Sequence, residues 1–308
     1  MTMPNFLILG AAKAGTTSLY AYLRQHPQIY LPRIKEPNFF AYGEAPFDRQ
    51  GPGAEIIRRN AIMTPAHYAQ LFAGVTQETA IGEASVTNLL PRACERIHHY
   101  VPDAKLIVLL RQPADRAYSH FLHHWRLGLE PLADFAAALA DEPKRLRERW
   151  PLTFCYQRIS HYTADLQQYL GAFSREQLRI YLYEDLATRP QQLLQEIFAF
   201  LGVDETFAPD VSVRYNVARL PRLPWLQCFL RHPHWLKGWL RLCLPGGWRK
   251  RLVAKIERAN WQPPPALAPV LRAEITRSFQ GEIIRLQQIL ARDLSHWLAP
   301  TGRLSSTK

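Results

Sequence analysis

The sequence predicts an α/β fold in three layers, with a central parallel sheet flanked by helices. Short apolar runs alternate with amphipathic segments over 1–202, as strands alternate with helices in such folds. The run KLIVLL at 105–110 consists of continuous, mostly branched apolar residues, which are typical of a strand buried on both faces. Strands linked by helices pair in parallel, and ligands then bind at the carboxyl ends of the strands.

The first strand, loop and helix are predicted in the segment PNFLILGAAKAGTTSLYAYL at 4–23. Asn5–Leu9 is an apolar run too short for a helix, and Thr16 opens an amphipathic helix. Between them, Gly10–Gly15 contains only small residues apart from Lys13. Small residues let the backbone approach a ligand, and a helix N-terminus favours an anion, so we expect a phosphate-binding loop here. We expect the bound phosphate to contact Lys13, Ala14, Gly15, Thr16, Thr17 and Ser18.

This loop departs from the phosphate-binding motif of nucleotide triphosphatases. That motif places a lysine directly after its second glycine, whereas Thr16 occupies this position and the lysine lies inside the loop, at Lys13. An ordinary strand-to-helix turn with an incidental lysine is the alternative interpretation.

The next segment, HPQIYLPRIKEPNFF at 26–40, contains a short extended piece at Ile29–Leu31 and the charged pair Lys35-Glu36. Prolines on either side stiffen the backbone around this pair, and irregular segments of this kind can hold a site residue in place. Judged from these residues alone, a solvated surface pair is the favoured interpretation. The segment 41–60 is rich in glycine, proline and charge, so we expect a surface loop that could form the rim of a site.

The strand at 105–110 leads into Arg111 and a helix expected over 114–125. Nucleotide triphosphatases use an aspartate on such a strand to organise magnesium, but this strand ends in arginine. A guanidinium can bind a phosphate through two hydrogen bonds, and Ser119 lies about two helical turns further on. We therefore expect Arg111 and Ser119 to bind a phosphate. The alternative is a capping or surface arginine.

The other expected elements follow from apolar periodicity. Expected strands lie at 79–84 and 178–182, and expected helices at 65–72, 88–99, 135–150, 160–170, 190–201 and 269–290. The segment 220–252 carries several tryptophans among basic residues. It fits an in-plane membrane helix or lid for a lipid-linked acceptor, or else a helix pair packed on the sheet, and we favour the packed pair.

The composition of the chain indicates which kinds of partner it can bind. The chain has 308 residues, of which 47% are hydrophobic, and we expect a single domain with an α/β core over 1–202 and a helical part over 203–308. The formal net charge of +12 favours an anionic partner, such as nucleic acid, an acidic membrane surface, a phosphate-rich cofactor or an acidic glycan. No basic run alternates with aromatic residues, so nucleic acid is not the expected partner.

Metal sites, disulfides and targeting segments are not indicated. The four cysteines are scattered without a CxxC pair, and His120 and His124 lie one helical turn apart without an evident third ligand. There is no charged start followed by a long apolar segment, and no run of ~18 apolar residues. We therefore expect reduced thiols, no signal peptide, no membrane span and a cytoplasmic location, with peripheral membrane contact through 220–252 as an option.

Three of these segments resemble the sulfotransferases that use 3′-phosphoadenosine 5′-phosphosulfate (PAPS), above all bacterial relatives of the heparan sulfate and other carbohydrate sulfotransferases. The segment at 6–18 has the family's order of strand, small residues, Lys, small residue, Gly and hydroxyl residues. The segment at 35–40 matches Lys-Glu-x-x-Phe-Phe, and that at 105–119 matches strand, Arg, x-Pro and Arg-x-x-Ser. The resemblance covers 4–202 and, more weakly, the last ~35 residues, where the pattern at 286–297 matches the family's C-terminal helix and tryptophan. It implies a P-loop-like fold and a metal-independent enzyme that transfers a sulfuryl group from PAPS and releases PAP.

The resemblance also implies roles for the site residues. Glu36 is the catalytic base, and Lys13 stabilises the leaving phosphate. The loop that contains Lys13, together with the start of the following helix, holds the 5′-phosphate. Arg111 and Ser119 hold the 3′-phosphate, and Arg116 is expected to form a supporting salt bridge.

Lys35 and Glu83 are assigned to substrate binding. The family often carries a second active-site lysine at the position of Ala84, so what replaces that lysine here is open, and Lys35 is one candidate. The family's Lys-Gly-Arg-type loop over the adenosine half of the donor has no counterpart after Asp204.

The acceptor is the least determined part of the prediction. We expect the hydroxyl or amine of a glycan, and a lipid or a small hydroxylated metabolite is the alternative. Two other classes stay open, namely a P-loop kinase and a basic protein that binds membrane surfaces. The sequence does not indicate an oligomeric state.

Overall fold

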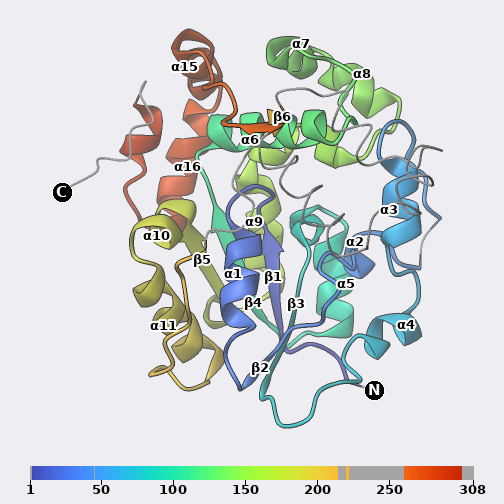
Figure 1. Cartoon of the computed structure of the whole chain (residues 1–308), viewed down its shortest axis with the longest axis vertical. Helices are drawn as coiled ribbons and strands as arrows, with labels where there is room; N and C mark the ends of the chain where they lie inside the picture. The colour runs from blue at the N-terminus through green and yellow to red at the C-terminus, as the bar shows by residue number, and fades with distance from the viewer. Residues whose placement is uncertain (1, 45, 214–219, 222–259, 300–308) are drawn as a thin grey trace, which may run out of the picture.

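The computed structural model describes residues 2–44, 46–213, 220–221 and 260–299. At its centre lies a five-stranded parallel sheet in the order β2-β3-β1-β4-β5 (Figure 1). Its strands are β1 (Phe6–Gly10), β2 (Ile29–Tyr30), β3 (Ala80–Ala84), β4 (Lys105–Leu110) and β5 (Leu178–Leu182). Two short strands, β6 (Leu220–Pro221) and β7 (Trp261–Gln262), pair antiparallel. The predicted α/β fold with a parallel sheet flanked by helices is confirmed.

The core of the sheet is formed by β1 and β4. Phe6 pairs with Lys105 on one side and with Gly82 on the other. A Cβ at Gly82 would lie 2.2 Å from the ring of Phe6, so a larger residue would displace that ring. From Leu106 to Leu110 every residue of β4 is fully buried, which explains why its apolar run predicts the strand with the correct bounds.

Thirteen described helices surround the sheet or extend beyond its ends. They are α1 (Thr16–Leu23), α2 (Phe39–Tyr42), α3 (Ala54–Asn60), α4 (Pro65–Gln70), α5 (Ala93–Tyr100), α6 (Pro113–Arg126), α7 (Phe135–Ala140), α8 (Glu142–Arg147), α9 (Tyr162–Ala172), α10 (Tyr183–Thr188), α11 (Pro190–Leu201), α15 (Pro269–Ser278) and α16 (Gln280–Leu290). Short 3-10 helices occur at η1 (Val86–Leu89), η2 (Leu152–Phe154), η3 (Arg158–Ser160), η4 (Arg175–Gln177) and η5 (Ser295–Leu298). In Figure 1, α6 crosses the molecule beyond the carboxyl ends of the central strands.

Two predicted helices are interrupted by proline. The helix expected at 88–99 begins only at Ala93, because Pro91 stands before it and disfavours helical geometry at the preceding residue. The helix expected at 135–150 is divided into α7 and α8, since Pro143 has no N–H with which to continue the ladder of α7.

Three other predictions of secondary structure were wrong. The loop expected at 41–60 contains α3, and α10 follows β5 directly although no helix was expected there. The helix expected at 269–290 breaks at Phe279, whose side chain is fully buried in the core.

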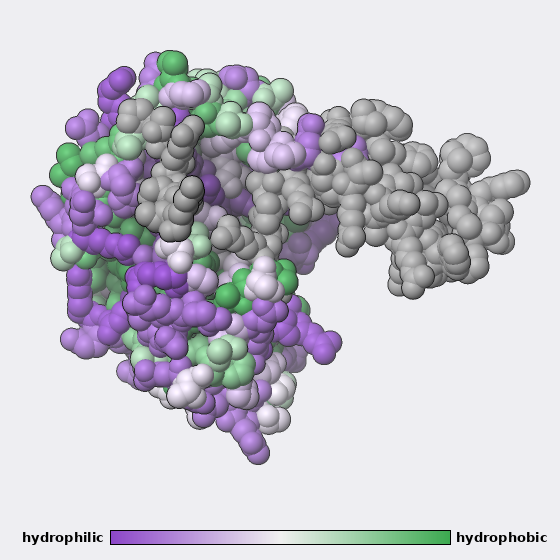
Figure 2. All heavy atoms as spheres, turned by 60° about the vertical axis from the view of Figure 1, so that its left-hand side comes forward, coloured by the Kyte–Doolittle hydropathy of each residue, from purple (hydrophilic) through white to green (hydrophobic). Residues whose placement is uncertain are grey.

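None of the helices in the described part of the chain combines the length and apolar character needed to cross a membrane. Figure 2 shows hydrophilic and hydrophobic residues interspersed over the coloured part of one face. Apart from residues 220–221, the segment 220–252, where a packed helix pair or an in-plane membrane helix was expected, lies outside the described residues.

Candidate active site

A cavity of about 800 Å³ lies at the carboxyl ends of the strands. It is lined by residues that follow four of them, namely Lys13, Val86, Arg111 and Tyr183. The structure brings most of the predicted site residues together on its walls. These are Lys13, Gly15, Thr16, Thr17, Ser18, Lys35, Glu36, Arg111 and Ser119. Ala14 and Glu83 do not line it.

The loop between β1 and α1 presents the start of a helix to the cavity. Gly15 is the N-cap of α1, with a left-handed φ of 95°, and no side chain of the described residues caps this helix start. A Cβ at Gly15 would lie 2.9 Å from the side chain of Leu186 on α10, so glycine also permits close packing there. Ala14 is fully buried and its N–H donates to the carbonyl of Ala11, so Ala14 supports the loop instead of facing the cavity.

Lys13 lies near several other cationic side chains. Burial, together with the charges of Arg126, Arg111 and Lys35, lowers the pKa of its ammonium to about 8. Lys13 is therefore mostly charged at neutral pH, yet it loses its proton far more readily than an exposed lysine does. An anion in the cavity would relieve the repulsion among these groups.

Arg111 is held beside the loop by three contacts. Its Nη1 donates to the carbonyl oxygen of Lys13 at 3.1 Å. Its guanidinium lies 4.8 Å from the centre of the Tyr183 ring, and its carbonyl accepts a hydrogen bond from the hydroxyl of Tyr162 at 2.9 Å. The two predicted phosphate-binding segments are thus in direct contact at one end of the cavity.

Glu36 faces the cavity from a strained turn. It has a left-handed φ of 63°, which is uncommon outside glycine, and its N–H donates to the carbonyl of Ala84 at 3.0 Å. Its Oε2 accepts the N–H of Val86 at 2.8 Å, and its Oε1 contacts the ammonium of Lys35. Asn38 adds a hydrogen bond from its side-chain amide to the carbonyl of Glu36 at 2.6 Å. The carboxylate is therefore held in position before any substrate is present.

The comparison with protein families assigns the chain to a family. Residues 4–208 match the model of the sulfotransferase family, and this range includes all the residues of the predicted site. The chain belongs to this family. The resemblance drawn from the three sequence segments is confirmed.

Individual relatives agree with this assignment. The sulfotransferase is 34% identical to a sulfotransferase from Alicyclobacillus acidocaldarius of known structure, with a TM-score of 0.76 over 97% of this chain and 100% of that one. It is 26% identical over 250 residues to carbohydrate sulfotransferase 15 of Rattus norvegicus, covering 65% of this chain and 44% of the relative. It is also 26% identical over 303 residues to human bifunctional heparan sulfate N-deacetylase/N-sulfotransferase 3, covering 96% of this chain and 31% of the relative. The chain thus spans less than half the length of these curated relatives.

Glu83 lies beneath the turn that carries Glu36. Only 1% of its surface is exposed, and its carboxylate accepts hydrogen bonds from the hydroxyl of Ser85, at 2.9 Å, and from the amide of Asn88. Burial raises its pKa to about 7, against the effect of these two donors. The N–H of Asn38 donates to the Ser85 hydroxyl in turn. The expectation that Glu83 contacts a substrate does not fit this position, because Glu83 supports the turn from below.

Sequence reasoning missed two histidines of the sulfotransferase site. His120 and His123 of α6 both line the cavity. Burial lowers the pKa of His123 to about 3 and that of His120 well below its ordinary value. Because the Arg116 guanidinium can only donate, the Nδ1 of His120, 3.2 Å away, must accept. Both imidazoles are therefore neutral at neutral pH, a signal that the helical spacing of the histidines alone did not give.

Arg116 differs from its predicted role. It is fully buried and donates to the hydroxyl of Ser160 and to the carbonyl of Tyr156, both at 2.7 Å. None of the described carboxylates lies within ion-pair distance of its guanidinium, so the expected salt bridge is wrong. Its role is to tie α6 to the segment before α9.

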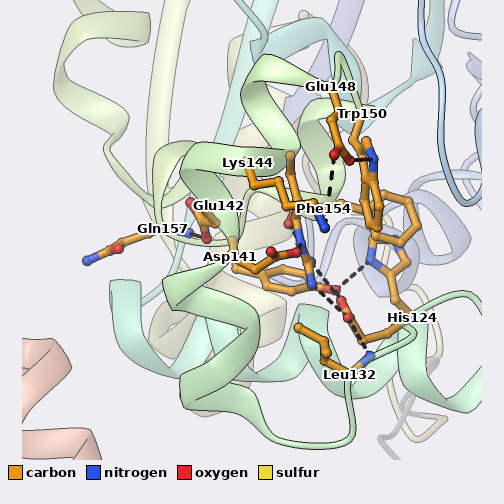
Figure 3. A network of polar contacts seen from close by, with 12 residues as sticks. His124, Leu132, Asp141, Glu142, Lys144, Glu148, Trp150, Phe154 and Gln157 are labelled. Atoms are coloured by element: carbon orange, nitrogen blue, oxygen red, sulfur yellow. Dashed lines mark hydrogen bonds and ion pairs between the residues drawn. The ribbon is translucent and has the colours of Figure 1, made fainter.

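The far end of α6 is fixed by a second buried network (Figure 3). His124 stacks on Phe154 with ring centres 4.0 Å apart, and its Nδ1 lies 3.2 Å from the hydroxyl of Tyr156. That hydroxyl donates to Glu130 at 2.6 Å, and Glu130 accepts two hydrogen bonds of 2.8 Å from Arg145. Both members of the ion pair are fully buried, which anchors α8 to the helix that carries the histidines.

The C-terminal helices complete the cavity. Arg272 of α15 forms a bidentate ion pair with Asp115 of α6, with hydrogen bonds of 2.8 and 3.0 Å. Both residues line the cavity. The segment 264–267 adds to the same wall. Gln112 donates to the hydroxyl of Thr276 and to the carbonyl of Trp297. The sulfotransferase site therefore includes residues far beyond the part of the chain in which the motifs lie.

Proposed function

We propose that this sulfotransferase transfers the sulfuryl group of PAPS to a hydroxyl or amine of an acceptor, preferably a glycan. The observation that carries the proposal is the contact between Arg111 and the carbonyl of Lys13. It places two cationic groups from separate motifs at one end of a cavity that also contains a positioned carboxylate, that of Glu36.

The residues at this end fit an adenosine bisphosphate. The start of α1, without a side-chain cap from the described residues, can donate backbone N–H groups to the 5′-phosphate, with Thr16, Thr17 and Ser18 beside it. Arg111 and Ser119 are available for the 3′-phosphate. PAPS would supply the activated sulfuryl group. Lys13 would offset the negative charge that develops on the oxygen bridging phosphate and sulfur.

Glu36 is the proposed general base. Its backbone contact with Ala84 and its hydrogen bond from Val86 orient the carboxylate toward the cavity, where it would accept the proton of the acceptor hydroxyl or amine. An acidic glycan suits the net charge of +12, and carbohydrate and heparan sulfate sulfotransferases are among the relatives.

Calorimetric titration with PAP, with ATP as the control ligand and without metal, tests the donor. We expect PAP to bind at least tenfold more tightly than ATP, about 1.4 kcal/mol. Equal or tighter ATP binding that depends on magnesium would instead support a kinase. Labelled PAPS with a panel of glycans, lipids and small alcohols then tests the acceptor.

The variant Glu36→Gln tests the base. It should abolish transfer to an acceptor and leave PAP affinity within twofold, because the base contacts the acceptor and not the adenosine phosphates. Loss of both properties together would contradict the assignment.

A further inference from the structure

The carboxylate of Glu36 is already engaged at both oxygens. Oε2 accepts the backbone N–H of Val86 at 2.8 Å, and Oε1 is covered by the ammonium of Lys35. The Lys35 side chain is 19% exposed and that of Glu36 31% exposed, so the pair is partly withdrawn from water. While the ammonium of Lys35 covers Oε1, that oxygen is not available for contact with an acceptor hydroxyl or amine.

The two contacts of the Glu36 carboxylate differ in how easily they can be broken. The N–H of Val86 belongs to the start of η1, and the backbone of Glu36 is itself fixed to Ala84. Lys35 reaches its partner through a flexible four-carbon stem. Its ammonium can therefore leave Oε1 by side-chain rotation while the backbone and the carboxylate stay in place.

The cavity offers Lys35 few other anions. Among the described residues that line it, Glu36 and Asp115 are the carboxylates, and Asp115 is paired with Arg272. Lys13 lies on the same wall and carries the same charge as Lys35, which is one of the groups that lower its pKa. The oxygens of a sulfonate beside Lys13 would be a new anion for Lys35.

We propose that Lys35 is a donor-responsive cover on the catalytic base, an inference that rests on the proposed function. Without PAPS, Lys35 neutralises Glu36. When the sulfonate of PAPS lies beside Lys13, the ammonium of Lys35 turns to the sulfonate oxygens and leaves Oε1. The base is then exposed only after the donor has bound, so the donor binds productively before the acceptor.

The transfer step that follows is balanced. The O–H or N–H bond of the acceptor breaks and its proton goes to Oε1 of Glu36. The acceptor atom forms a bond to sulfur as the bond from sulfur to the bridging oxygen breaks. That electron pair remains on the 5′-phosphate of PAP. In this step Lys35 shares with Lys13 the charge that develops on the transferring group.

The test compares the affinities for PAPS and PAP, measured by calorimetry without acceptor so that no transfer occurs. The two ligands differ by the sulfonate, and their similar charge cancels general electrostatic effects in the ratio. Lys35→Met should lower the affinity for PAPS about tenfold relative to the affinity for PAP, and Lys35→Arg should retain most of the affinity that Lys35→Met loses. Lys144→Met, which removes an exposed lysine on α8, is the matched control and should leave the ratio unchanged.

Glu36→Gln gives the decisive measurement. Because Lys35 no longer has to leave a carboxylate, this variant should bind PAPS about threefold more tightly relative to PAP. In the double variant with Lys35→Met this gain should vanish, as in a double-mutant cycle of coupled residues. Equal changes for PAP and PAPS, or an unchanged ratio in Glu36→Gln, would overturn the proposal. Failure of the unmodified protein to bind PAP at all would instead overturn the proposed function.

Discussion

The Nη1 of Arg111 donates a hydrogen bond to the carbonyl oxygen of Lys13, across a sequence separation of 98 residues. The contact joins the loop after β1 to the end of β4, two neighbouring strands of the sheet. It holds the Arg111 guanidinium against the backbone of the loop that carries Lys13, and both residues line the same cavity.

Arg111→Ala should weaken PAP binding by about 2 kcal/mol, as expected for loss of a charge-assisted contact. Calorimetric titration measures the change. Arg179→Ala, which removes an exposed arginine on β5 outside the cavity, is the matched control and should have no effect. PAP affinity within twofold of the unmodified protein would show that Arg111 does not bind the ligand.

The affinity for PAP should fall as the pH rises through about 8. Lys13 has a lowered pKa of about 8, so it is charged below this value and loses the charge that attracts a phosphate above it. Titrations between pH 7 and pH 9.5 should show a loss of about tenfold. Lys13→Arg keeps its charge over this range and should remove the dependence. A decline of the same size in that variant would assign it to another group.

Glu282→Gln should lower stability near neutral pH. Glu282 of α16 accepts hydrogen bonds from the N–H and the hydroxyl of Thr163, both at 2.6 Å, at the start of α9. Together with His161, these donors bring its pKa down to about 2 despite burial, which acts in the opposite direction. Because the pKa is depressed in the folded state, the stabilisation is present above the ordinary value of 4.5 and is lost as the pH falls toward 2.

Urea unfolding at several pH values measures this effect. The variant should be less stable than the unmodified protein by about 2 kcal/mol at pH 6, and the difference should shrink below pH 4. A difference that stays constant with pH would show that the side chain contributes only through packing.

Glu83→Gln should have the opposite pH dependence. Burial raises the pKa of Glu83 to about 7, so the folded state retains a proton that the unfolded chain releases near 4.5. The unmodified protein should therefore lose about 2 kcal/mol of stability between pH 4.5 and pH 7 through this group. The variant should lack this loss, whereas the exposed Glu95→Gln should retain it. Parallel curves for the unmodified protein and Glu83→Gln would show that Glu83 does not titrate in this range.

The sequence predicted the parts of the molecule that local pattern determines. β4, β5 and α11 have the expected bounds, because each is an apolar run or an amphipathic segment that ends at a clear boundary. Lys13 and Arg111 were predicted to share a site because their segments follow strands of one parallel sheet, and the carboxyl ends of such strands meet at one edge. Glu36 was assigned to that site only through the resemblance to the family.

The failures have a common physical reason. Whether Glu83 faces a ligand or lies beneath the 36–38 turn depends on how β3 packs under that turn, which no local pattern encodes. The wall formed by Arg272 depends on a pairing with Asp115 across 157 residues. The neutral state of His123 follows from burial and from the charges around it, not from its spacing on the helix.

The cavity takes its lining from Ala12 through Arg272, and this has a consequence for biosynthesis. A ribosome would release the Lys13 loop and Arg111 well before the residues that close the wall. Domains generally fold as units, and side chains of α15 and α16 belong to the same hydrophobic core as the sheet, so the pocket is complete only once the whole chain has emerged. A ligand that requires the closed pocket would stabilise only the finished protein, in proportion to its affinity and concentration. The concentration of such a ligand should therefore affect how much of the newly made protein stays folded.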